Sequence, residues 1–169
     1  MNAQYVEIDI SELRQFTDKL RKLADGEFIE ELLRFLDATG FEMLKVIEDE
    51  IIRLKVVDTR LLLNSFHRGS EDNVYELDEG DLSLEIGTNV KYAGWVNDGH
   101  RQKPGRFIPG TWNGDGKFRY DPSADTGMVL KERWVEGKHY IEDAVKIMEK
   151  KFPQALNRFI DNWLKSYFS

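Results

Sequence analysis

Apolar residues recur every three or four positions in the first third of the chain, which is the period of an amphipathic helix. Leu13, Phe16 and Leu20 lie on one such stripe, and a second, longer stripe runs over residues 27–56. If residues 28–56 form one helix, it spans about 43 Å. Gly40 lies within it and marks either a bend or a close packing contact. We therefore expect two N-terminal helices, of which the second is long.

The pattern changes to alternation in the middle of the chain, which predicts a β-hairpin. Residues 74–77 and 82–86 alternate between apolar and polar side chains. The short polar turn between them contains Gly80, and a glycine in such a turn is typical of a hairpin. A short helix over residues 61–63 is expected just before the hairpin.

A long segment rich in glycine and proline follows the hairpin. The glycines and prolines of residues 97–116 forbid regular structure, so we expect a long ordered loop there. Short strands over residues 118–120 and 128–134 follow it. Tyr92 and Trp95 come just before the loop, and their spacing fits one buried face.

Two helical stripes close the chain. The first runs from Tyr140 to Met148, and the second from Ala155 to Phe168, with Pro153 suited to the first turn of the last helix. The sequence thus predicts an α+β fold with two N-terminal helices, a small antiparallel sheet with a long ordered loop, and two C-terminal helices. The length suits a single domain over residues 1–169.

The composition excludes several classes of protein. The chain has no cysteine, which rules out disulfides, thiolate zinc sites and cysteine nucleophiles. No apolar run approaches the roughly 20 residues of a membrane span, and the first residues do not resemble a signal peptide. We expect a soluble protein that is made in the cytoplasm and has no membrane partner.

Charge is separated along the chain, although the net charge is only −7. An acidic block without any base consists of Glu71, Asp72, Glu76, Asp78, Glu79, Asp81 and Glu85. A basic block, broken only by Asp115, consists of His100, Arg101, Lys103, Arg106, Lys117 and Arg119. Opposite blocks favour self-complementary association over broad DNA binding. The candidate interface residues are therefore Glu71, Asp72, Glu76, Asp78, Glu79, Asp81, Arg101, Lys103, Arg106, Trp112, Lys117 and Arg119.

The sequence contains no convincing pattern for catalysis or metal binding. His67, His100 and His139 lack the spacing of a His-Glu-x-x-His zinc site. A triad of Ser65, His67 and Asp98 can be written down, but no Gly-x-Ser-x-Gly turn supports it. We expect no catalytic residue, no metal and no cofactor.

Aromatic and basic side chains alternate over residues 91–120, a pattern that also occurs where proteins stack single-stranded nucleic acid. The competing interpretation is that most of these rings pack beneath the loop. Trp112 fits either interpretation.

Three ordered segments resemble a known family. They are Val-Val-Asp-Thr-Arg-Leu-Leu-Leu-Asn-Ser at 56–65, Ile-Gly-Thr-Asn-Val-Lys-Tyr-Ala at 86–93 with residues 96–100, and Trp-Val-Glu-Gly-Lys-His-Tyr at 134–140. Their order and spacing resemble the neck proteins (tail-completion or head–tail joining proteins) of tailed bacteriophages and of prophage tail-like particles. The resemblance covers roughly residues 45–145.

The resemblance implies a non-enzymatic structural protein that joins a completed tail to the head-side connector as a homo-oligomeric ring. Its partners would be other phage neck or tail proteins and further copies of itself, with DNA only as passing cargo. It would act in the host bacterial cytoplasm during assembly and then remain in the virion or tail-like particle. Two alternatives stay open: a phage-encoded hydrolase that uses Asp98 and His100, and a single-stranded nucleic-acid-binding module built on residues 91–120.

Overall fold

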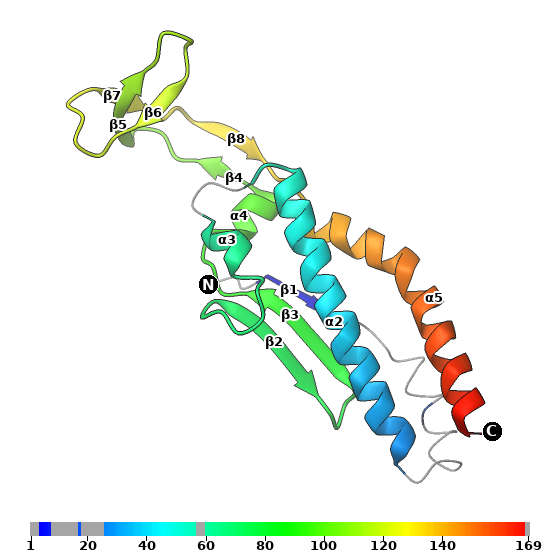
Figure 1. Cartoon of the computed structure of the whole chain (residues 1–169). Coiled ribbons are helices and arrows are strands. Elements are labelled where there is room, and N and C mark those ends of the chain that lie inside the picture. The colour runs from blue at the N-terminus through cyan, green and yellow to red at the C-terminus, as the bar shows by residue number, and fades with distance from the viewer. Residues whose placement is uncertain (1–3, 8–16, 18–25, 57–59, 168–169) are drawn as a thin grey trace. The chain divides into compact units, whose positions relative to one another are not determined.

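The chain forms two compact units, shown in the computed structural model of Figure 1. The structure describes residues 4–7, 17, 26–56 and 60–167. The body consists of residues 1–97 and 138–169, and the insert consists of residues 98–137. The helix predicted around Leu13 to Leu20 falls outside the described residues except for Thr17. Organisation of the whole chain as one domain stays a prediction.

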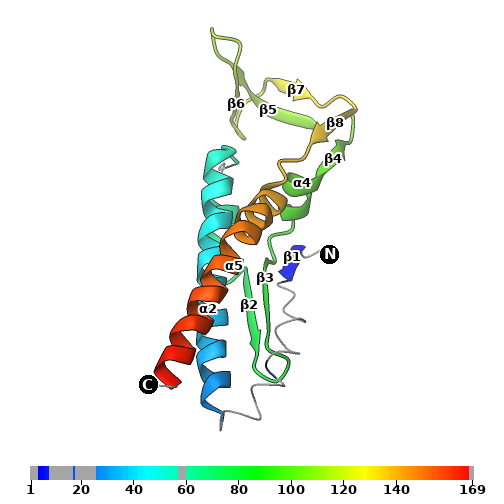
Figure 2. The same cartoon turned by 90° about the vertical axis from the view of Figure 1, so that its right-hand side faces the viewer.

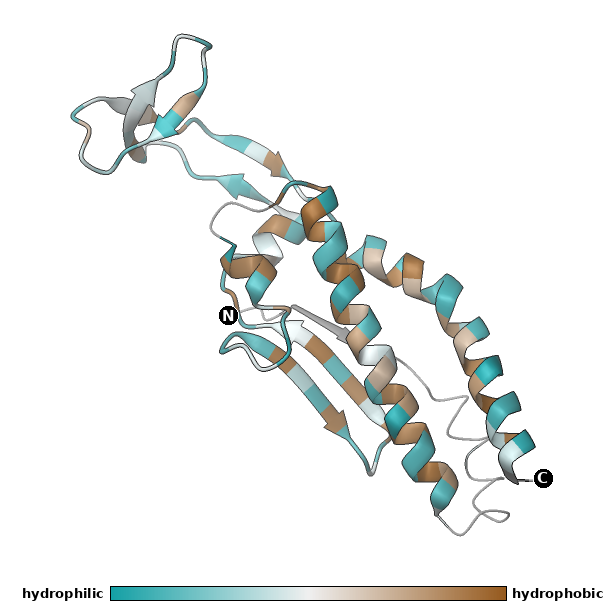
Figure 3. Cartoon of the chain, in the orientation of Figure 1, coloured by the Kyte–Doolittle hydropathy of each residue, from teal (hydrophilic) through white to brown (hydrophobic). Residues whose placement is uncertain are grey.

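A long helix forms the centre of the body. Helix α2 (Glu27–Arg53) confirms the long helix expected from the second apolar stripe, and its apolar stripe is visible in Figure 3. A Cβ atom added to Gly40 would lie 2.3 Å from Leu84 Cδ2 and 2.5 Å from the Tyr75 hydroxyl oxygen. Gly40 therefore lets the helix lie against the sheet, which is the close packing contact that the sequence allowed.

The sheet of the body has the strand order β1-β3-β2 and is antiparallel. Its strands are β1 (Gln4–Glu7), β2 (Asn73–Asp78) and β3 (Ser83–Thr88), and the short helix α3 (Leu61–Asn64) comes before β2. The predicted hairpin and short helix are confirmed, whereas β1 was not expected. Leu84 and Ile86 of β3 are buried on the side of α2. Figure 1 shows α2 between this sheet and helix α5 (Tyr140–Tyr167), and in the view of Figure 2 α5 crosses in front of α2.

The prediction of two C-terminal helices is wrong, because α5 is one helix from Tyr140 to Tyr167 with Pro153 inside it. A proline in a helix interior removes one hydrogen bond and crowds the preceding turn. Packing against α2 keeps the helix continuous beyond it: the Phe35 and Phe159 rings stack at 4.8 Å, and the Phe28 and Trp163 rings meet at 4.5 Å. The apolar face after Pro153 therefore continues the helix instead of starting a new one.

The segment expected to be an irregular loop contains regular structure. Helix α4 (Ala93–Asp98) leads into the insert, whose strands are β4 (Gly99–Gln102), β5 (Phe107–Trp112), β6 (Phe118–Tyr120), β7 (Gly127–Val129) and β8 (Arg133–Glu136). The strand expected over residues 128–134 is thus two short strands, β7 and β8. Strands β4 and β8 pair with each other, and the other three form a sheet in the order β6-β5-β7. Pro109 fits within β5 because its carbonyl still accepts a hydrogen bond from Asp121, while the β6 ladder begins only at Gly110.

The insert has no apolar core. Gly110 is its only fully buried residue. The Phe118 ring lies over Gly110, and the Phe107 ring lies over Gly127, so that a Cβ at either glycine would meet the ring at 2.6 Å. Rings laid over glycines thus cover part of each face of a single-layer sheet, and the remaining apolar surface stays exposed.

Candidate assembly interface

The acidic block lies on the β2–β3 hairpin and the turn before it. Five of its carboxylate side chains are exposed: Glu71, Glu76, Asp78, Glu79 and Asp81. The Asp81 backbone N–H donates to Asp78 Oδ1 at 2.8 Å, which fixes the tip of the hairpin. The predicted acidic residues therefore come together on one edge of the body.

Two glutamates face each other across the sheet. Glu85 of β3 is directly opposite Glu76 of β2. Alternation along β3 places this pair on the face away from Leu84 and Ile86. Like charges directly opposite in a sheet are destabilising. Neither Glu76 nor Glu85 has an ion-pair partner among the described residues, so a basic partner would relieve this repulsion.

An aromatic cluster lies beside the hairpin on the α2 side and consists of Asp37, Phe41, Arg68 and Tyr75. The Tyr75 hydroxyl donates to the Asp37 backbone oxygen at 2.8 Å, and burial together with this aspartate raises the pKa of Tyr75. The Arg68 guanidinium lies 4.5 Å from the Phe41 ring centre and 4.3 Å from that of Tyr75, and it pairs with Asp37 at 3.0 Å. Phe41 nevertheless remains 46% exposed.

The basic block lies in the insert. Arg101 is paired with Glu132, and Lys117 Nζ lies 3.4 Å from Asp115. Lys103, Arg106 and Arg119 are exposed and have no ion pair within the described part of the chain. The insert has seven bases and six acids, so its net charge is +1. The net charge of the whole chain is −7, and the rest of the chain therefore carries −8. The two candidate charge blocks therefore belong to two different units.

The insert also exposes large apolar side chains. Trp112 is 58% exposed and Tyr120 62% exposed, and Phe107, Val129 and Trp134 are similar. Trp112 and Tyr120 share one face of the β6-β5-β7 sheet by register, and exposed apolar patches mark interaction sites in soluble proteins. Trp112, which the sequence left open, is thus a surface residue. The expectation that Trp95 is buried is wrong, since it is 62% exposed on α4, whereas Tyr92 packs against the core as expected.

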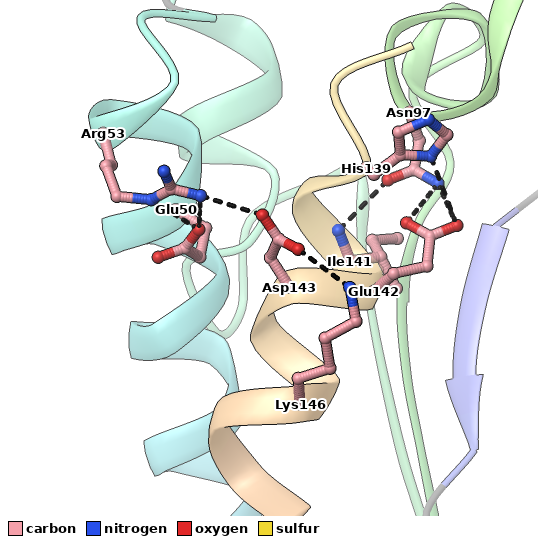
Figure 4. Close-up of polar contacts among 8 residues, drawn as sticks. All are labelled: Glu50, Arg53, Asn97, His139, Ile141, Glu142, Asp143 and Lys146. Carbon is pink, nitrogen blue, oxygen red and sulfur yellow. Dashed lines mark hydrogen bonds and ion pairs between the residues drawn. The ribbon is translucent and has the colours of Figure 1, made fainter.

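A buried asparagine fixes the place where the chain leaves and re-enters the body (Figure 4). The Asn97 side-chain oxygen accepts a hydrogen bond from the Ile141 backbone N–H at 3.1 Å, and its amide nitrogen donates to Glu142 at 2.9 Å. Asn97 therefore caps the first turn of α5 from a different element. The backbone N–H of His139 also donates to the Asn97 carbonyl at 2.9 Å. A lone asparagine gave no signal in the sequence, because its partner lies 44 residues away.

Ion pairs next to this cap join α2 to α5 (Figure 4). Arg53 Nε donates to Glu50 at 2.7 Å, and its Nη2 atom donates to Asp143 at 2.8 Å. The hydrogen bond to Glu50 raises the pKa of Arg53. The Lys146 Nζ atom lies 3.2 Å from Asp143 and adds a further ion pair to this group. These contacts hold the two long helices together, and the sequence alone did not indicate them.

The described residues offer little support for a catalytic triad of Ser65, His67 and Asp98. The Ser65 hydroxyl donates to the Leu62 carbonyl at 2.7 Å and accepts from Thr88, while His67 lies 3.1 Å from Glu48. Ser65 is therefore committed to the core, and His67 faces a carboxylate. Within the described ranges, no group of three or more His, Asp or Glu side chains is placed to hold a metal ion.

A pocket of about 820 Å³ opens between the start of α2 and the end of α5. Its lining includes three glutamates, Phe159 and Trp163. Two of these glutamates, Glu30 and Glu31, form exposed ion pairs with Arg34. Among the described residues that line this pocket, no base is held next to a nucleophile and no set of metal ligands is found.

Comparison with known proteins shows the family. Residues 14–99 match the family model described as "Bacteriophage HK97-gp10, putative tail-component". This chain belongs to that family of bacteriophage tail components, which confirms the resemblance seen in the sequence. The match ends at residue 99, where β4 of the insert begins.

Two relatives from Bacillus subtilis (strain 168) cover nearly the whole chain. "Uncharacterized protein YqbI" is 42% identical over 163 residues, which are 92% of this chain and 97% of the relative. "Phage-like element PBSX protein XkdI" is 38% identical over 158 residues, 92% of this chain and 98% of the relative. No solved structure matches. In the described part of the chain, no helix is both long and apolar enough to cross a bilayer.

Proposed function

We propose that this phage structural protein joins the tail to the head-side connector as a homo-oligomeric ring. The acidic hairpin of one copy contacts the basic insert of the next. The observation that supports this most is the division of charge between the two units. Glu76 and Glu85 of the body have no ion pair among the described residues. The same holds for Lys103, Arg106 and Arg119 of the insert. A head-to-tail contact of this kind closes into a ring when its rotation permits.

Charge of this kind mainly sets register and encounter rate, so its contribution depends on salt. We expect the purified protein to sediment as an oligomer at low salt and to dissociate as salt rises. Replacing Glu76 and Glu79 by lysine, or Arg106 and Arg119 by glutamate, should weaken the oligomer, because each change places like charges opposite one another. Mixing the two variants should restore contacts between unlike copies. The exposed Lys150→Glu on α5 is the control for the arginine variant, because it also makes the charge more negative but lies outside both blocks.

The joining role is tested in particles. In a phage or prophage that lacks this protein, electron microscopy should show completed tails and filled heads that are not attached. The charge variants should reproduce that defect, and Lys150→Glu should not. Attached, infectious particles in the absence of the protein would rule out the joining role.

The single-strand-binding alternative is favoured by one observation, the exposed Trp112 and Tyr120 beside Arg119. It predicts that single-stranded DNA is retarded in a shift assay at physiological salt, and that Trp112→Ala abolishes the retardation. The assembly role predicts no tight DNA complex, because DNA is cargo and the body is strongly acidic. Partners in the particle are then other neck or tail proteins, in the host cytoplasm during assembly and in the virion or tail-like particle afterwards.

A further inference from the structure

The two faces of the three-stranded sheet in the insert differ in polarity. Cross-strand partners share a face, and residues alternate between faces along a strand. By register, one face holds Ile108, Gly110, Trp112, Phe118, Tyr120 and Met128. None of these residues is charged. The opposite face holds Phe107, Pro109, Thr111, Arg119, Gly127 and Val129, and so includes a charge.

The uncharged face is already organised as a surface. The Trp112 and Phe118 rings meet edge to face with their centres 5.2 Å apart. Phe118 lies over Gly110, while Trp112 and Tyr120 remain more than half exposed. In stable folds the apolar face of a sheet is buried against another element. This face therefore has both the rigid aromatic side chains of a contact surface and a physical need for cover.

The edge of the body at β2 has matching features. β2 is the outer strand of its sheet, so one row of its backbone polar groups has no strand partner in that sheet. Exposed Phe41 lies beside it, with its ring centre 5.9 Å from that of Tyr75 on β2. Acidic Glu76 and Asp78 lie on the same strand but on the face of the sheet opposite Tyr75, and Arg68 stacks on the Phe41 ring. The β2 edge thus presents an aromatic ring on one face and acids on the other. The insert sheet likewise presents rings on one face and Arg119 on the other, so a contact at the edge matches ring with ring and acid with base.

We propose that the uncharged face of the insert docks on the β2 edge of a second copy, with Trp112 against Phe41. This inference rests on the proposed ring and identifies the apolar anchor of its subunit contact. The charged side chains then lie at the rim of this contact. One of them is Arg119, which is on the opposite face of the insert sheet but is the sequence neighbour of both Phe118 and Tyr120. Aromatic residues at the centre of an interface supply most of its affinity, while exposed rim charges supply little.

The test is a double-mutant cycle on the full-length protein, read by sedimentation at fixed salt as the concentration of half-assembly. Trp112→Ala and Phe41→Ala should each raise that concentration about tenfold or more. The double variant should be little worse than either single variant, because both remove the same contact. Phe107→Ala is the matched control: its ring is similarly exposed but lies on the opposite face of the same sheet, so we expect less than a twofold change. Thermal unfolding of each variant checks that the body stays folded, and Trp112→Phe, which keeps a ring, should retain most of the assembly.

Other outcomes separate the anchor from the ring. If the unaltered protein assembles and Trp112→Ala assembles equally well, the anchor is refuted while the proposed ring stands. Equal effects of Phe107→Ala and Trp112→Ala, or effects of Trp112→Ala and Phe41→Ala that simply multiply, also refute it. If the unaltered protein is a monomer at every concentration, including in the presence of assembled tails, both the ring and its anchor are wrong.

Discussion

Gly40 is the position where one added methyl group should weaken the body most clearly. In Gly40→Ala the new carbon would lie 2.3 Å from Leu84 Cδ2, whereas carbon atoms pack at about 3.5–4.0 Å. The neighbours have little room to move: Leu84 is fully buried, and Tyr75 is held by two hydrogen bonds to Asp37 and by the Arg68 stack. Helix α2 must therefore shift away from the sheet or strain its own side chains.

Two opposing effects set the magnitude. Overpacking of a well-packed core costs about 1–3 kcal/mol. Alanine instead of glycine in a helix interior returns roughly 0.5–1 kcal/mol. The net loss should be about 1–2 kcal/mol, which lowers the melting temperature by roughly 2–8 °C for a protein of this size.

Denaturant titration and thermal unfolding, followed by circular dichroism, measure this loss. Ala38→Gly, at an exposed position of the same helix, calibrates the backbone contribution. In a Leu84→Ala background, which removes the closest atom, the Gly40→Ala penalty should shrink but not disappear, because the Tyr75 hydroxyl oxygen still lies 2.5 Å from the added carbon. If Gly40→Ala were as stable as the unaltered protein or more stable, the close approach of α2 to the sheet would be refuted.

Three further changes test other parts of the structure. Pro153→Ala should stabilise the protein by about 1–3 kcal/mol in denaturant titrations, because a proline inside a helix costs about 3 kcal/mol; a loss of stability would favour two separate helices. Asn97→Ala should cost about 1–2 kcal/mol, since it removes the cap of α5, and amide exchange at Ile141 should rise while exchange at the middle of α2 stays unchanged. Glu85→Gln should raise the stability of the unassembled protein by a few tenths of a kcal/mol at neutral pH and weaken its oligomer, because it removes the repulsion between Glu85 and Glu76; lower stability at low salt would contradict that repulsion.

The sequence by itself determined the elements whose signals are local. The stripe over residues 27–56 gave α2, the alternation on either side of Gly80 gave the β2–β3 hairpin, and the charge blocks could be read directly. The three short segments pointed to the phage tail-component family that the comparisons show. Each of these signals depends on the spacing of neighbouring side chains along the chain, and such spacing is visible without any knowledge of the fold.

The tertiary structure decided what depends on partners distant in the chain. Pro153 lies inside α5 because contacts with α2 outweigh its local preference to begin a helix. Gly110 and Gly127 became part of a sheet because rings from neighbouring strands cover them. Pro109 lies in the same sheet, where its carbonyl accepts a hydrogen bond from the Asp121 backbone N–H. Trp95 and Trp112 are exposed, and Asn97 is buried, because burial is set by what packs against a residue and not by its type. Local preferences are worth about 1 kcal/mol or less per residue, so several long-range contacts together can overrule them.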